Sequence, residues 1–226
     1  WLCLFILAFN QLAFGGVHTW AATLSQVIVF VAAWLIVAGW SMKAILSGRW
    51  AQVRPSPGHP LLLFLVLFFG LWAWQLWPLP PDWVGVLSPE TLNMHLPLIE
   101  AGVLQQLGPL SLSLDSFTSL RLGIEHLAQA LFFLMVLYSV KSRGRVQALA
   151  MGLVGLALFQ VIYGLIQSAS PEQHIWWWEK HSKAQGWLTG TYINRNHLAG
   201  FLELAIPVAF GLGLAFWPEP GKREET

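Results

Sequence analysis

The chain has 226 residues, of which 56% are hydrophobic and only 10% are charged. Soluble globular domains carry about 25% charged residues, so this composition excludes an ordinary soluble protein and indicates a membrane protein. The formal net charge is +1, and no basic block provides the electrostatic footprint of a nucleic-acid-binding protein, so we expect no nucleic-acid partner. The single cysteine, Cys3, excludes an intramolecular disulfide and a cysteine-cluster metal site.

The first apolar run, residues 1–14, is shorter than the roughly 20 residues that a spanning helix needs. The chain begins with Trp1 rather than methionine, so we expect this first span to be truncated. A signal peptide can be argued neither for nor against.

Further apolar runs follow that are candidates for spanning helices. They cover residues 20–40, 61–77, 120–140, 146–168 and 197–217. With the first run they predict an all-α fold, a polytopic integral membrane helical bundle with about six transmembrane helices. We expect residues 1–226 to form a single transmembrane domain.

The basic residues predict the orientation, because lysine and arginine are retained on the cytoplasmic side. They gather in loops at about 41–60 and 141–145, which we expect to be cytoplasmic. The loop at about 78–117 has acidic residues but no lysine or arginine, and alternation places it outside together with the loop at about 169–196. The N-terminus and the C-terminal tail are then cytoplasmic.

Capping residues predict a short interfacial helix in the first outer loop. In "LSPETL", Ser88 is a candidate N-cap, Pro89 suits the first helical position and Glu90 lies in the first turn. Nearby tryptophans are typical of an aromatic belt at the level of the lipid head groups.

The last apolar run contains a polar seam. Asn196 and Glu203 are seven residues apart and share a helix face, and Gly200 between them allows close backbone approach. Pro207 cannot donate to the carbonyl of Glu203, which then needs another partner. One interpretation is that this seam lines a water-accessible cavity.

Arg195 and His197 would lie at the mouth of such a cavity, where a guanidinium suits a phosphate-bearing head group through its forked donors. The alternative is structural: Arg195 snorkels to the interface, an asparagine caps the helix, and Glu203 bonds to a neighbouring helix. In the fourth run, Arg121 and Glu125 share a face and either line the same cavity or form an intrahelical ion pair.

The second outer loop, "HIWWWEKHSKAQGW" from residue 174 to 187, combines tryptophans with two lysines. It is interpreted either as a contact for a glycan or lipid phosphate, with the lysines attracting phosphate, or as an interfacial anchor. Two histidines without a fixed carboxylate set are weak evidence for a metal site.

The segment "TGTYINRNHLAGFLELAIP" resembles the start of the characteristic region of the O-antigen ligase and polymerase superfamily of bacterial membrane proteins. In that pattern a Gly-Thr-aromatic stretch precedes Asn-Arg-Asn-His, Ala-Gly, an acidic residue and a proline. The matching positions here are Gly190, Thr191, Tyr192, Asn194, Arg195, Asn196, His197, Ala199, Gly200, Glu203 and Pro207. Weaker similarities in "LAFGGVHTW", "PPDWVGVLSPET" and "LSLDSFTSL" extend the resemblance over nearly the whole chain.

The resemblance implies a glycosyltransferase of the bacterial inner membrane that takes a glycan from undecaprenyl diphosphate and passes it to an acceptor hydroxyl. It implies no cofactor and no metal. Arg195 is then a candidate for binding the diphosphate, with Asn194, Asn196 and His197 shaping the mouth of the site, and with Glu203 and Arg121 as further candidates. The expected partners are the polyprenyl-diphosphate-linked glycan and membrane lipids.

Family members have more spans than this chain, and the outer loop usually assigned to catalysis lies in their C-terminal half. We therefore expect the chain to be truncated at both ends or to be a half-length relative, with no catalytic residue assigned. The alternatives are a non-catalytic membrane subunit that needs a partner subunit, and a transporter with Glu203 as a coupling site.

Overall fold

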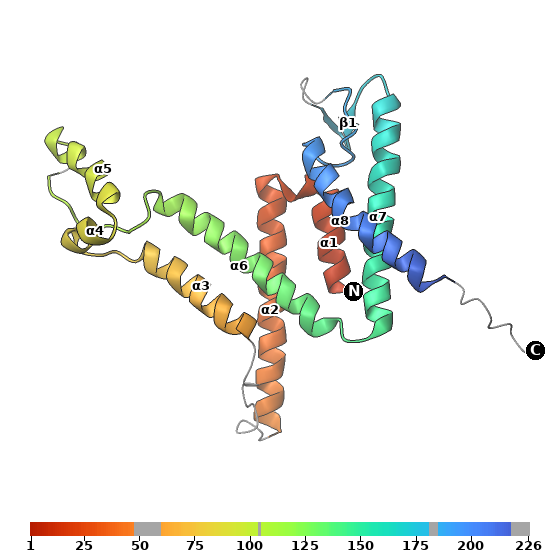
Figure 1. Ribbon diagram of the computed structural model, residues 1–226, viewed down its shortest axis with the longest axis horizontal. Helices are drawn as coiled ribbons and strands as arrows, with labels where there is room; N and C mark the ends of the chain where they lie inside the picture. The colour runs from red at the N-terminus through yellow and green to blue at the C-terminus, as the bar shows by residue number, and fades with distance from the viewer. Residues whose placement is uncertain (48–59, 104, 181–184, 218–226) are drawn as a thin grey trace, which may run out of the picture. The chain divides into compact units, whose positions relative to one another are not determined.

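The structure, a computed structural model, describes residues 1–47, 60–103, 105–180 and 185–217 (Figure 1). In chain order its elements are α1 (Leu2–Leu12), η1 (Phe14–Gly16), α2 (Thr19–Leu46), α3 (Pro60–Leu76), α4 (Pro81–Leu87), α5 (Pro89–Glu100), α6 (Ser116–Ser139), α7 (Arg143–Ala169), β1 (His174–Ile175), β2 (Trp178–Glu179) and α8 (Arg195–Ala215). The sheet found in these ranges is one antiparallel pair of two-residue strands. The predicted all-α class is confirmed.

Four of the described helices, α2, α6, α7 and α8, have the length and apolar composition of a membrane span. The chain is a helical membrane protein. The prediction of six spans was wrong for the other two runs, because α1 and α3 are apolar helices of only 11 and 17 residues. Positive φ angles at Phe14 and Gly15 turn the backbone soon after α1 ends, and proline follows α3 at position 78.

Capping side chains set the starts of the long helices. Asp115 accepts a hydrogen bond from the Thr118 backbone N–H at 2.9 Å before α6, and the hydrogen bonds from Thr118 lower the pKa of the Asp115 carboxyl. The Ser142 hydroxyl accepts from the Arg145 N–H at 3.4 Å before α7. The Asn194 side chain caps α8. Each cap satisfies a backbone donor that has no partner within its own helix.

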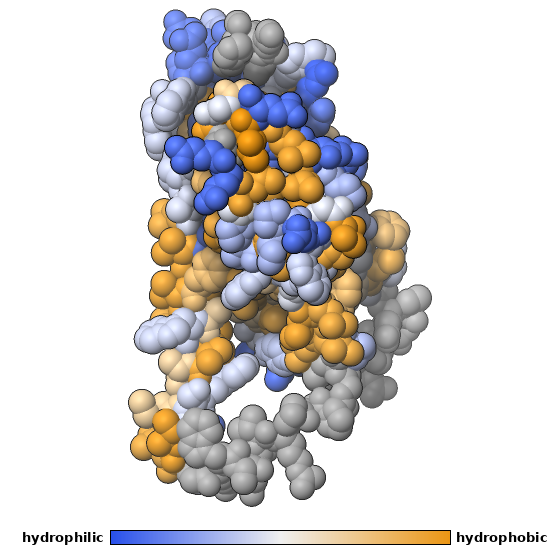
Figure 2. Space-filling model, turned by 90° about the vertical axis from the view of Figure 1, so that its left-hand side faces the viewer, coloured by the Kyte–Doolittle hydropathy of each residue, from blue (hydrophilic) through white to orange (hydrophobic). Residues whose placement is uncertain are grey.

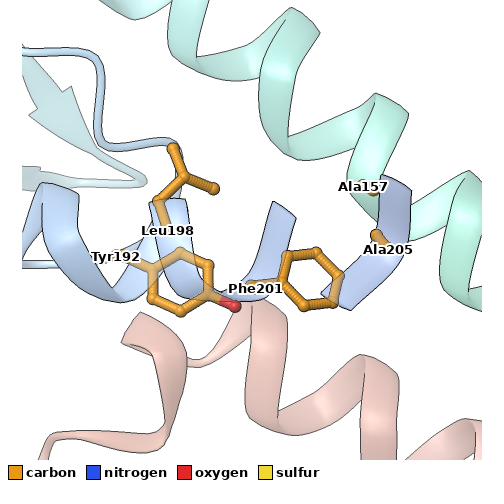
Figure 3. Packing of buried hydrophobic residues seen from close by; sticks show 5 residues of the cluster. All are labelled: Ala157, Tyr192, Leu198, Phe201 and Ala205. Atoms are coloured by element: carbon orange, nitrogen blue, oxygen red, sulfur yellow. The ribbon is translucent and has the colours of Figure 1, made fainter. Parts of the chain in front are cut away.

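The chain divides into two compact units, one formed by Trp1–Leu35 with Phe132–Thr226 and the other by Ile36–Leu131. In the first unit α8 packs on α7, and α1 also contacts α7. Figure 3 shows the buried cluster between α7, α8 and the loop before α8. Its members are Ala157, Tyr192, Leu198, Phe201 and Ala205. The small side chains of Ala157 and Ala205 allow α7 and α8 to approach closely.

In the second unit, α3 packs against the first turns of α6. The Trp72 indole lies against Gly123, where any side chain would overlap the ring, and Trp72 Nε1 donates to the Ser119 carbonyl at 2.9 Å. Leu79 and Leu110 then form an antiparallel bridge after α3. These contacts join the end of α3 to the start of α6, so the two helices run antiparallel.

The predicted short helix in the first outer loop is present as α5, with Pro89 at its first turn and Ser88 at its N-cap. The Ser88 hydroxyl does not cap the backbone but shares a hydrogen bond of 2.8 Å with the Thr91 hydroxyl. Buried Thr91 also donates to the Leu112 carbonyl at 3.1 Å. The α4–α5 pair is thereby attached to the segment that leads into α6.

Large apolar side chains are exposed along the spanning helices, among them Trp34 on α2 at 67% and Phe210 on α8 at 70%. Figure 2 shows apolar residues over wide areas of the visible face. Exposure of this extent suits side chains whose solvent is lipid, where leucine and phenylalanine have no reason to be buried.

Candidate functional site

The Asn-Arg-Asn-His cluster lies at the N-terminus of α8, with all four side chains exposed. Asn194 is the N-cap, and its side-chain oxygen accepts from the Asn196 N–H at 2.9 Å. Arg195 is the first helical residue, followed by Asn196 and His197 on the first turn. These four of the six predicted binding residues therefore lie together at one helix terminus, as their adjacency in the sequence requires.

The Arg195 guanidinium lies over the indole of Trp187, 3.5 Å from the ring centroid. A guanidinium stacked in this way is held by the ring quadrupole while its N–H groups remain directed outward around its edge. The helix N-terminus adds partial positive charge from its unsatisfied backbone N–H groups. The arrangement can bind an anion such as a phosphate by charge-assisted hydrogen bonds.

Two buried glutamines of α7 hold the loop that leads to this site. Gln160, fully buried, accepts from the Thr191 N–H at 2.9 Å through Oε1 and donates through Nε2 to Thr191 Oγ1 at 2.7 Å. Gln167 donates through Nε2 to the Gly190 carbonyl at 3.1 Å and accepts from Thr189 Oγ1 at 3.1 Å. Residues 189–191 are fixed on the surface of α7 in this way.

Glycines allow this loop to approach α7. Gly190 has a φ of 59°, and a Cβ added there would overlap Gln160 Oε1. Gly164 lies between Gln160 and Gln167 on the same helix face, and a Cβ there would lie 2.7 Å from Leu188 Cδ2. The close packing explains the Gly-Thr part of the motif as a structural requirement.

Tyr192 continues the loop into the core. Its ring lies 6.2 Å from that of Phe201 and against Gly15, where a Cβ would overlap the ring. Only 4% of the residue is exposed, and burial raises the pKa of the phenol. Among the described residues its hydroxyl has no hydrogen-bond partner. Tyr192 anchors the start of α8 on η1.

Lys180 does not fit the interpretation in which the lysines of this loop attract phosphate, because Lys180 is only 3% exposed. Its ammonium donates to Gln167 Oε1 at 3.1 Å, Gln173 Oε1 at 3.3 Å and the Trp187 carbonyl at 2.6 Å. All three acceptors are neutral, and burial lowers the pKa of Lys180. The other lysine, Lys183, and His181 lie outside the described residues.

The tryptophans of this loop differ in their surroundings. Trp176 has a φ of 57°, donates through Nε1 to the Leu12 carbonyl at 2.8 Å and stacks beside Phe159 and Tyr163. Trp177 is 77% exposed at the turn of the hairpin. Trp176 is therefore a structural anchor, while Trp177 and the half-exposed Trp187 present aromatic surface.

Glu203 and Asn196 are both exposed on α8, whereas Leu198, Phe201 and Ala205 face the core. The seam thus lies away from the buried side of α8, and its role as a cavity lining stays a prediction. Arg121 is exposed on α6 and belongs to the second unit, and its predicted share in the site also stays a prediction.

The residues that our sequence reasoning missed are Gln160 and Gln167. Both lie in the apolar run at 146–168, seven residues apart on one face, with Gly164 between them. Burying two side-chain amides on one face of a spanning helix costs free energy unless each amide finds a hydrogen-bond partner. This cost could have indicated from the sequence that Gln160 and Gln167 bind another segment of the chain.

No family model matches the chain, and searches of curated proteins and of solved structures found no match. The fold and the site together define a helical membrane protein with a polar cluster, which includes Arg195, at the N-terminus of a membrane-length helix.

Proposed function

We propose that the chain is a membrane glycosyltransferase of the O-antigen ligase and polymerase type, or its N-terminal half. It takes a glycan from undecaprenyl diphosphate and passes it to an acceptor hydroxyl. The observation that carries the proposal is the exposed Arg195 guanidinium, stacked on Trp187 at the start of a helix long enough to cross a membrane. The resemblance of "TGTYINRNHLAGFLELAIP" to the pattern of that family supports it.

The chemistry explains why a cation is needed there. The acceptor oxygen forms a bond to the anomeric carbon, the bond between that carbon and the diphosphate oxygen breaks, and the acceptor hydroxyl loses its proton. The leaving polyprenyl diphosphate gains negative charge, which donors aimed at that charge stabilise. Arg195 supplies such donors, and Asn194, Asn196 and His197 border them on the first turn.

We place the protein in the bacterial inner membrane, with the Arg195 end of α8 on the outer side. The basic residues at 141–145 then lie on the cytoplasmic side, as the charge rule requires. This orientation needs α7 to cross the membrane, because α7 separates the 141–145 turn from the Arg195 end of α8. Its 27 residues reach about 40 Å along a helix axis, which exceeds the hydrocarbon core of about 30 Å.

The test is glycan transfer by cells or membranes that contain Arg195→Ala. We expect transfer to be lost while the protein remains in the membrane at its normal level. Arg143→Ala is the matched control, because Arg143 is also an exposed arginine at the first position of a spanning helix. Undiminished transfer by the Arg195 variant would replace this proposal with that of a non-catalytic membrane subunit.

A further inference from the structure

We infer that Trp187 is a positioning residue for Arg195 and that buried Lys180 fixes Trp187 in place. The inference rests on the proposed function, since it assigns how the anion-binding guanidinium is held. It starts from one contact, the Arg195 guanidinium at 3.5 Å from the centre of the Trp187 ring. One face of the indole is thereby occupied, although the residue is half exposed.

The backbone of Trp187 is held from the inside. Its carbonyl accepts the shortest of the three Lys180 hydrogen bonds, at 2.6 Å. On the preceding residue, Gly186 has a φ of 81° and donates its N–H to Gln173 Oε1 at 2.9 Å. Gln173 Oε1 also accepts a hydrogen bond from the Lys180 ammonium. The ammonium therefore links the Gln173 side chain to the Trp187 carbonyl.

The network is attached to α7 through Gln167. This side chain bonds Lys180 through Oε1 and the carbonyls of His174 and Gly190 through Nε2. The chain is therefore fixed before Trp187, at Gln173 and Gly186, and after it, at Thr189 and Gly190. An indole whose backbone is constrained on both sides is a rigid platform.

A rigid platform matters because arginine has several rotatable bonds and loses their freedom when it binds an anion. Stacking on Trp187 restricts the guanidinium before the anion arrives, and the stack leaves the edge of the guanidinium accessible. Lys180 contributes through the position of Trp187.

The experiment titrates the full chain, purified in detergent, with inorganic pyrophosphate by isothermal titration calorimetry. The variants are Arg195→Ala, Trp187→Leu, Trp187→Phe and the double variant with Ala at 195 and Leu at 187. We expect Trp187→Leu to weaken binding about tenfold, and Trp187→Phe to retain most of the affinity because an aromatic face remains. Trp177→Leu, which removes an exposed tryptophan of the same loop, is the matched control and should bind normally.

The double-mutant cycle tests whether Trp187 acts by positioning Arg195. If Trp187 acts through Arg195, the double variant binds no more weakly than Arg195→Ala alone. Additive losses, or an unaltered affinity in Trp187→Leu while Arg195→Ala loses binding, would overturn the positioning role and leave the proposed function standing. Unaltered binding in Arg195→Ala would overturn the proposed anion site itself. Lys180→Met should weaken binding in the wild-type background and have no further effect in Arg195→Ala.

Discussion

At the scale of single residues, side chains of α7 determine the conformation of the loop that presents Arg195. Gln160 and Gln167 each satisfy several polar groups of residues 189–191, and leaving one buried polar group unpaired costs about 1–3 kcal/mol. In the observed conformation these amides and the polar groups of the loop satisfy each other. The position of Arg195 thus depends on Gln160 and Gln167, which are buried and do not take part in the proposed anion binding.

Gly190→Ala should destabilise the first unit by about 1–3 kcal/mol, because the new methyl group overlaps Gln160 Oε1 and φ is 59°. The measurement is thermal unfolding in detergent. Gly102→Ala is the control, since Gly102 has a similar φ of 71° but open space around it. Equal losses in both variants would assign the effect to φ alone rather than to the contact with Gln160.

The burial of Lys180 predicts that the free energy of unfolding depends on pH. Burial lowers its pKa from the model-compound value of 10.5, so in the range just below 10.5 the unfolded chain holds a proton that the folded chain has released. The unfolding free energy contributed by this group then rises with pH toward 10.5. We expect the wild-type melting temperature, relative to that of Lys180→Met, to increase over this range.

The control for that comparison is Lys43→Met, which removes an exposed lysine from α2. Its melting temperature should follow that of the wild type at every pH. A difference between wild type and Lys180→Met that stays constant across the range would contradict the role of burial.

At the scale of elements, the sequence predicts the positions of the long helices well. The apolar runs at 146–168 and 197–217 correspond to Arg143–Ala169 and Arg195–Ala215, because hydropathy reports directly which segments suit lipid. The boundaries differ by a few residues where caps such as Ser142 and Asn194 start the helix earlier. The loop network was not predictable, since its bonds join residues distant in the chain, such as Thr191 Oγ1 and the Gln11 carbonyl at 2.6 Å.

Packing between α3 and α6 yields a prediction for the second unit. Gly123→Ala should loosen the pair by about 1–3 kcal/mol, because its methyl group overlaps the rigid Trp72 indole. Protease sensitivity of the segment after α3 measures the change. Gly70→Ala, at a position on α3 with open space around it, should behave as wild type. An unaltered Gly123 variant would show that Trp72 does not set the distance between the helices.

At the scale of the whole molecule, the membrane class follows from composition, whereas the number of crossings does not. A hydropathy count treats every apolar run alike, but η1 turns the backbone soon after α1 and α3 has only 17 residues. The proposed orientation depends on α6 and α7, because α6 begins after an acidic loop and ends before the basic residues at 141–145. With α6 crossing, Gly102 and Gly144 lie on opposite sides of the membrane.

Single-cysteine labelling measures on which side of the membrane each of these positions lies. In a Cys3→Ser background, Val17→Cys and Ser47→Cys mark the two ends of α2, Gly102→Cys marks the first outer loop, and Gly144→Cys marks the first turn of α7. A membrane-impermeant maleimide added to intact spheroplasts should label position 102 but label position 144 only after permeabilisation, because α6 separates the two. Positions 17 and 47 lie at opposite ends of α2 and should be labelled from opposite sides. Labelling of 144 but not of 102 in intact spheroplasts would put the Arg195 end of α8 on the cytoplasmic side, because α7 lies between 144 and Arg195, and would contradict the proposed function.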